Sequence, residues 1–186
     1  LGWIRRQQER FCAQPRQSQR EMVSGESHYY MGQRYLLDVV ELDAPPQVRL
    51  RNSRTLELRV RPCADREKRE AVLYRWYRAR LKEQIPPLIA KWEPAIGLKV
   101  AEWRVKRMRT RWGTCNVQKG RVWLNLELVK KPPQCLEYVL VHEMVHLMER
   151  HHNDRFRLLM TQFMPQWQNY RDLLNAAPLA YERWEY

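Results

Sequence analysis

Four of the five histidines of this chain lie between positions 142 and 152, and two of them form a His-Glu-x-x-His pattern. Residues four apart on a helix differ by about 40° in direction and about 6 Å in height, so His142 and His146 can reach one metal ion. Glu143 lies roughly 100° round from His142, where its carboxylate meets a water molecule at the metal. Zinc lowers the pKa of such a water towards about 7, and a carboxylate completes its deprotonation. The pattern therefore predicts one zinc ion on His142 and His146, with Glu143 as the catalytic base.

Two histidines leave the metal site incomplete, and His152 is the expected third ligand. On an unbroken helix His152 would lie about 15 Å beyond His142 along the axis, too far to share one metal ion. We therefore expect a helix over residues 133–150 to end near Glu149–Arg150, after which the chain folds back. His152 then returns to the metal from the following turn.

Several alternatives stay open at this point. His151 is a rival third ligand, and so is Glu149, although Glu149 requires the helix to continue straight beyond His146. Either Asn153 or Asp154 is expected to cap the helix that follows the turn. The His-Glu-x-x-His pattern also occurs in ordinary helices, where both histidines are hydrogen-bonded core or surface residues. The apolar run that precedes the motif and the paired histidines downstream favour a metal site.

The composition is that of a folded globular protein. A length of 186 residues predicts one domain, or one domain with a small appendage. The hydrophobic fraction of 44% and the aromatic fraction of 11% exclude a disordered chain. No apolar run approaches the roughly 18 residues of a membrane span, and no leader is recognisable, although the chain begins with Leu rather than Met. The four cysteines include no C-x-x-C pair, which favours reduced thiols and a cytoplasmic protein.

The net charge of +13 is strongly basic and attracts nucleic acid or other polyanions. One stretch, residues 106–111, carries four basic side chains between Trp103 and Trp112. Such a stretch either contacts nucleic acid through phosphates and base stacking or forms a solvated strand face. Charge alone does not choose between these interpretations, because basic residues are spread through the whole chain.

Hydrophobic periodicity predicts an α+β protein. The expected order is a short N-terminal helix, a β-hairpin-rich region, a helix that ends at Pro86-Pro87, a second short helix, two strands and three final helices. The corresponding ranges are 1–12, 28–61, 65–84, 88–96, 99–110, 121–129, 133–150, 154–163 and 165–174. We expect a helix and β-hairpin region over 1–63 and a catalytic domain over 64–186.

Arg111 and Trp112 are candidate substrate-binding residues beside the predicted helix. An edge strand in this region is able to pair with an extended peptide, while Arg111 binds a carboxylate or a phosphate. Alternatively, Trp112 and Trp123 pack in the core and Gly113 shapes a bend.

Four segments between residues 109 and 156 carry a family resemblance: 111–115 (RWGTC), 120–125 (GRVWLN), 138–146 (YVLVHEMVH) and 152–156 (HNDRF). Together they resemble the YgjP-like metal-dependent hydrolases, which are relatives of the SprT-like and WLM zinc metallopeptidases. In these relatives a Phe or Trp follows the third histidine ligand by four residues, which implies His152 because Phe156 stands there. Thr114 replaces the more usual Ser. The resemblance reaches upstream to residues 32–35 and weakly to 3–5, and it implies that the chain is truncated at its start.

The resemblance implies a zincin-like fold, in which an active-site helix packs on a small, mostly antiparallel sheet, and it implies hydrolysis, usually of peptides. SprT-like relatives act on proteins bound to DNA, which would agree with the charge of +13.

Three functions are therefore in competition. The leading hypothesis is a zinc-dependent metallopeptidase that acts on a peptide or protein substrate. The second is a nucleotide phosphohydrolase, which the basic charge suits but which no Gly-rich phosphate loop or carboxylate cluster supports. The third is a nucleic-acid-associated protein with a structural metal, which would require a closed sphere of four ligands. Neither the oxyanion-stabilising residue nor the oligomeric state follows from the pattern.

Overall fold

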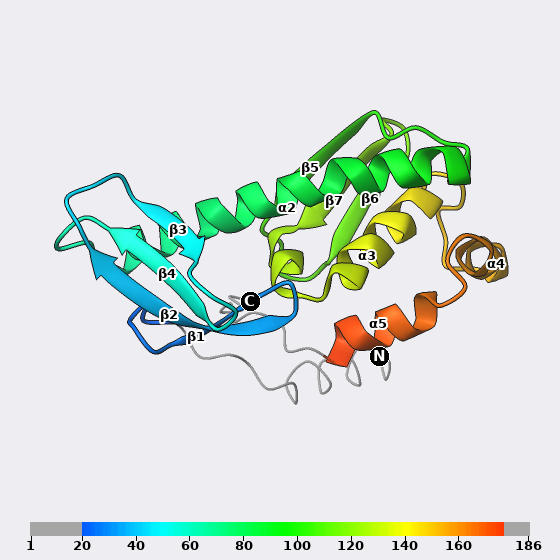
Figure 1. Cartoon of the computed structure of the whole chain (residues 1–186). Helices are drawn as coiled ribbons and strands as arrows, with labels where there is room; N and C mark the ends of the chain where they lie inside the picture. Colours follow the sequence, from blue (N-terminus) through cyan, green and yellow to red (C-terminus); the bar gives the residue numbers. More distant parts are fainter. Residues whose placement is uncertain (1–19, 177–186) are drawn as a thin grey trace, which may run out of the picture.

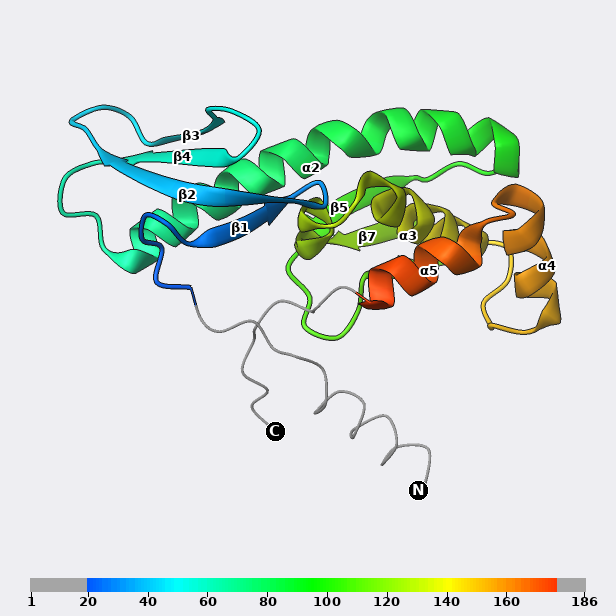
Figure 2. The same ribbon diagram turned by 60° about the horizontal axis from the view of Figure 1, so that its bottom comes forward.

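The computed structural model describes residues 20–176 (Figure 1). A four-stranded sheet lies at one end and a three-stranded sheet at the other, and one long helix, α2 (Arg66–Ile96), runs along both (Figures 1 and 2). The architecture confirms the α+β class. The helix expected over 1–12 lies outside the described residues, and the division at residue 63 stays a prediction.

The N-terminal sheet consists of β1 (Ser27–Tyr30), β2 (Gln33–Glu41), β3 (Gln47–Leu50) and β4 (Thr55–Val60) in the order β1-β2-β4-β3. The β1–β2 and β3–β4 pairs are antiparallel and the β2–β4 pair is parallel. Met31 and Gly32 form the β1–β2 turn with φ of 50° and 79°. Their amides donate to the carbonyls of Val129 and Lys130 at 2.9 and 3.2 Å, so the hairpin tip docks on the segment that leads into the site.

Helix α2 is continuous, so the predicted break at Pro86-Pro87 is wrong. Asp65 caps its start by accepting a hydrogen bond from the Lys68 amide, and Gly97 ends it in the left-handed conformation. The helix survives because one apolar stripe continues through the prolines at spacings of three and four, and because all three prolines face solvent. The buried stripe is Leu73, Tyr77, Leu81, Ile85, Ile89, Trp92 and Ile96.

The second sheet consists of β5 (Glu102–Lys106), β6 (Gly113–Asn116) and β7 (Arg121–Asn125) in the order β5-β7-β6. The β5–β7 pair is parallel and the β6–β7 pair is antiparallel, so the sheet is mixed. The strands expected over 99–110 and 121–129 are both too long.

The second of these strands ends early because of the side chain of Asn125. Its amide nitrogen donates to the carbonyls of Met108 and Arg111 at 2.7 and 2.8 Å, and its oxygen accepts from the Glu127 amide at 3.2 Å. These bonds stop the strand and cap a short 3-10 helix, η1 (Leu126–Lys130). The alternating leucines that predicted a longer strand remain buried in this helix.

Three more helices follow within the described residues: α3 (Pro133–Val145), α4 (Asp154–Phe163) and α5 (Trp167–Ala176). Helix α3 packs between the second sheet and α2 on one side and α4 and α5 on the other (Figures 1 and 2). It is therefore buried nearly all round. No helix within residues 20–176 is long and apolar enough to cross a membrane.

Candidate metal centre and active-site cleft

Helix α3 presents His142 and Glu143 on its last turn, and it ends sooner than predicted. The expected helix over 133–150 stops at Val145, and His146 is its C-cap. The Val145 carbonyl accepts hydrogen bonds from the amides of Met148 and Glu149, both at 2.9 Å, so the chain curls into a turn there. The expected fold-back is present, four residues earlier along the chain than the predicted position.

The turn leads directly into α4, whose first residue is Asp154. The side-chain oxygen of Asn153 accepts a hydrogen bond from the Phe156 amide at 3.0 Å. Of the two expected candidates, Asn153 rather than Asp154 is therefore the cap. This cap places His152 just before the helix, facing the end of α3. The structure therefore brings His152 to the other two histidines.

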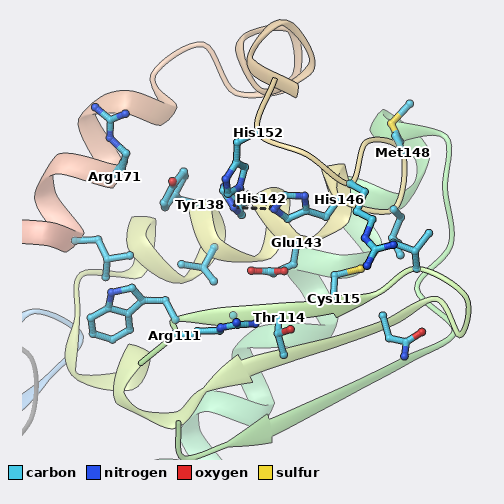
Figure 3. A pocket seen from close by; sticks show the side chains of 18 of the residues that line it. Arg111, Thr114, Cys115, Tyr138, His142, Glu143, His146, Met148, His152 and Arg171 are labelled. Atoms are coloured by element: carbon cyan, nitrogen blue, oxygen red, sulfur yellow. Dashed lines mark hydrogen bonds between the residues drawn. The ribbon is translucent and has the colours of Figure 1, made fainter. Parts of the chain in front are cut away.

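The Nε2 atoms of the three histidines converge on one point (Figure 3). His142 Nε2 lies 3.1 Å from the Nε2 atoms of both His146 and His152, and the latter two are 2.9 Å apart. With Zn–N bonds of about 2.0–2.1 Å, two nitrogens at a tetrahedral angle lie about 3.3 Å apart, so a small expansion fits the set to a metal ion. The three imidazoles are therefore a suitable donor set for a divalent metal.

Two contacts hold these imidazoles in place. His146 Nδ1 donates to the Glu149 carbonyl at 3.0 Å, which leaves its Nε2 lone pair free to bind a metal ion. The ring of Phe156 contacts all three imidazoles, at centroid distances of 4.9 Å from His142, 4.6 Å from His146 and 4.7 Å from His152. Nδ1 of His142 is buried with no hydrogen-bond partner among residues 20–176.

The surroundings keep His142 and His146 in the neutral form that binds metals. Burial, together with the neighbouring His146 and His152, lowers the pKa of His142 to about 3. Burial also lowers the pKa of His146. At neutral pH both rings therefore carry a free lone pair.

The rival ligands do not join the cluster. Within the described residues, the group close enough to share a metal consists of His142, His146 and His152 alone. The side chain of Glu149 accepts a hydrogen bond from the His151 amide at 3.2 Å, while its carbonyl orients His146. Glu149 thus supports a neighbouring ring, and the exposed side chain of His151 stays outside.

Glu143 lies beside the histidines and is only 6% exposed. Burial raises the pKa of its carboxyl to about 8, and the charge of Arg111 opposes that rise. A metal cation bound by the three histidines would lower the pKa of Glu143 again and favour its carboxylate form. The environment therefore suits a group that accepts and returns a proton.

The main chain of β6 packs directly on this carboxylate. A Cβ atom at Gly113 would lie 2.6 Å from Glu143 Oε1 and 2.7 Å from its Cγ. Gly113 was expected to shape a bend or a substrate strand, and the sequence carried no signal for its contact with Glu143. The residue is needed because any side chain there would displace the carboxylate.

Replacing Gly113 with Ala is expected to lower kcat for the reaction of this site about 10²-fold, because a displacement near 1 Å at a reacting group costs about that much. Metal content is expected to stay at the wild-type value, since the three atoms nearest a Cβ at Gly113 all belong to Glu143, which is not part of the histidine cluster. The measurement pairs turnover and metal analysis with the thermal unfolding midpoint, which checks that the variant is folded. A folded variant with kcat within twofold of wild type would contradict this role.

A cleft of about 950 Å³ opens in front of the histidines. Helix α3 forms one wall and β6 the other, and α5 contributes Arg171 and Leu174 (Figure 3). The candidates Arg111 and Trp112 both line it, and Trp112 also lies under Lys131, whose Nζ is 5.4 Å from the ring centroid. The contributions of Arg150 and Arg171 were missed, because no local pattern links them to the motif. That of Tyr138 was missed although it stands four residues before His142 on the same helix, with the ring centroids 5.7 Å apart.

The basic stretch over 106–111 does not form one strand face, because β5 ends at Lys106 and Arg111 faces the cleft. Lys106 lies over the ring of Trp123 at 4.9 Å and Arg107 over Tyr74 at 4.6 Å. Binding of nucleic acid by this stretch stays a prediction.

Fold and site together define a class: α+β proteins in which a His-Glu-x-x-His helix and the turn after it bring three histidines to metal-binding distance. The chain belongs to the YgjP-like family, whose metallopeptidase-domain model matches residues 1–177. Among solved structures, it is similar to the metallopeptidase zymogen of Pyrococcus abyssi abylysin, with 16% identity and a TM-score of 0.44 over 47% of this chain and 89% of that one. No protein of curated function matches it significantly.

Proposed function

We propose that the protein is a zinc-dependent peptidase whose metal is held by His142, His146 and His152 and whose catalytic base is Glu143. The observation that carries the proposal is the convergence of three imidazoles beside a buried carboxylate, all facing one cleft. Three histidines are the ligand set of hydrolytic zinc sites, and membership of a metallopeptidase family favours a peptide bond as the target.

The residues divide the chemistry among them. Zinc would supply Lewis acidity, which polarises the scissile carbonyl and lowers the pKa of water towards about 7. Glu143 accepts the proton of the attacking water and passes it to the leaving amine. Gly113 keeps Glu143 in position, and Phe156 and the Glu149 carbonyl orient the histidines. Arg111 and Tyr138 line the cleft beside Glu143 and are candidates for the oxyanion-stabilising group.

The cleft suits an extended peptide. Strand β6 is an edge of its sheet, and all four of its residues, Gly113, Thr114, Cys115 and Asn116, line the cleft. An edge strand offers unpaired backbone groups to which a substrate strand adds by main-chain hydrogen bonds.

The other candidate functions have less support. Nucleotide phosphohydrolases hold Mg²⁺ through carboxylates, and Glu143 is the single acidic residue that lines this cleft within residues 20–176. A structural zinc site is closed by four protein ligands, whereas the cluster among the described residues has three.

Metal removal tests the proposal. Dialysis against a chelator is expected to abolish cleavage of an unfolded protein substrate, and one equivalent of zinc is expected to restore it. Zinc should also raise the unfolding temperature, because it binds the folded state. Assays with and without DNA test whether the charge of +13 directs the enzyme to protein substrates on nucleic acid. Undiminished peptide cleavage after metal removal, or hydrolysis of nucleoside triphosphates instead of peptides, would refute the proposal.

A further inference from the structure

The charges that line the cleft are unbalanced. Three arginines face it from three different elements: Arg111 from the loop before β6, Arg150 from the turn after α3, and Arg171 from α5. Against them stands Glu143, the one acidic side chain of the lining within residues 20–176. The cleft is therefore net positive before any metal charge is added.

Two of these arginines have no ion pair or side-chain hydrogen bond. Arg111 and Arg150 are exposed residues, and neither forms such a contact with any residue in the 20–176 range. The charge of Arg111 also acts on Glu143 inside the cleft. Some arginines elsewhere are paired with acids: Arg49 and Arg59 both bind the Glu57 carboxylate, at 2.7 and 2.5 Å. Others, such as Arg34 and Arg75, form no ion pair with any residue in the 20–176 range, so what distinguishes Arg111 and Arg150 is that both line the cleft.

The third arginine is held in a defined place. Arg171 lies over the ring of Trp167 at 5.2 Å and pairs with the neighbouring Asp172 at 3.0 Å. Figure 3 shows Arg111 and Arg171 at the Tyr138 end of the cleft, on two opposing walls. Met148 lies at the other end, and Arg150 follows it by two residues.

We propose that the cleft selects peptides that carry Asp or Glu close to the scissile bond, with Arg111 and Arg150 binding the carboxylates. This inference rests on the proposed peptidase function and names its substrate class. A guanidinium binds a carboxylate through two parallel hydrogen bonds, which specify the planar acid as well as its charge. A substrate lysine or arginine at the same place would be repelled by the positive charge of the cleft arginines.

The test uses three fluorogenic peptides that differ at the residues flanking the scissile bond: Glu, the isosteric Gln, or Lys. For the zinc-loaded full chain, kcat/KM is expected to be at least about tenfold higher for the Glu peptide than for the Lys peptide, a difference near 1.4 kcal/mol. The preference should fall as salt is added, because exposed charges are screened. The double change Arg111→Gln and Arg150→Gln should reduce the ratio of the two peptides below about threefold.

The ratio, rather than the absolute rate, is the readout, so any general loss of activity in the variant cancels. Arg75→Gln, on the exposed face of α2, is the matched control and should keep the wild-type ratio. A parallel measurement of peptide binding to Glu143→Gln separates recognition from turnover. Equal kcat/KM for the three peptides would overturn the inference while leaving the peptidase function intact. Glu-selective binding without cleavage by the wild type would instead overturn the proposed function and support the selectivity.

Discussion

Substitution of Glu143 by Gln is expected to lower kcat for peptide hydrolysis by about 10²–10⁴-fold, the usual contribution of a general acid–base residue. Gln has the shape of Glu but neither accepts the proton of water nor returns it to the leaving amine. Metal content should remain at the wild-type value, because the Glu143 carboxylate is not among the atoms that converge at the histidine cluster. Peptide turnover and elemental analysis of the same preparation measure the two quantities together.

Glu149→Gln is the matched control for this change. Its side chain accepts a hydrogen bond from the His151 amide and lies outside the cleft lining, so a Gln oxygen can replace it. We expect turnover close to wild type for this variant. If Glu143→Gln kept a tenth or more of the wild-type kcat, another group would have to be the base.

Substitution of His152 by Ala is expected to lower metal affinity by more than about 100-fold, because it removes a ligand. Loss of a residue that only supports a ligand from outside the coordination sphere costs roughly 10–100-fold. Peptidase activity should fall with metal occupancy and return only in part when zinc is in large excess. His152 is exposed, so its loss leaves no large core cavity and the fold should persist. Isothermal titration calorimetry with zinc measures the affinity, and circular dichroism checks the fold.

His151→Ala is the natural comparison, because it removes an imidazole one position earlier in the chain. That side chain lies outside the cluster, so zinc affinity and turnover are both expected to match wild type. The opposite ranking, with His151 needed and His152 dispensable, would mean that the turn after α3 has a different conformation when metal is bound.

The elements that the sequence predicts well are those whose causes are local. Asn153 caps α4, which begins at Asp154, and the predicted range begins at the same residue. The start is predictable because a cap bond joins residues only three apart. The β1–β2 hairpin lies in the region 28–61 that was expected to be rich in hairpins, and its turn uses Gly32, whose φ of 79° suits glycine.

The predictions that fail do so where packing outweighs local preference. Pro86 and Pro87 would end an isolated helix, but in α2 they lie on the solvent side of a helix whose buried stripe continues past them. Leu126 and Leu128 alternate as in a strand, yet the side chain of Asn125 converts the segment into a 3-10 helix. In α2 the deciding contacts come from residues that are distant in the sequence. At Asn125 a local cap bond acts together with bonds to the carbonyls of Met108 and Arg111, which lie 17 and 14 residues away.

The same division applies to the site. Helical spacing alone predicts that His142 and His146 share a face beside Glu143, because the geometry of one turn does not depend on the rest of the fold. The tertiary structure decides everything that involves a second element. It brings His152 to 2.9 Å from His146, places the main chain of Gly113 against Glu143, and brings Arg171 of α5 across the cleft from Arg111. These contacts depend on how the last helices fold back over α3. That fold-back is determined by burial of Phe156, Trp167 and Leu174 in a shared core, and the spacing of residues within the motif does not encode it.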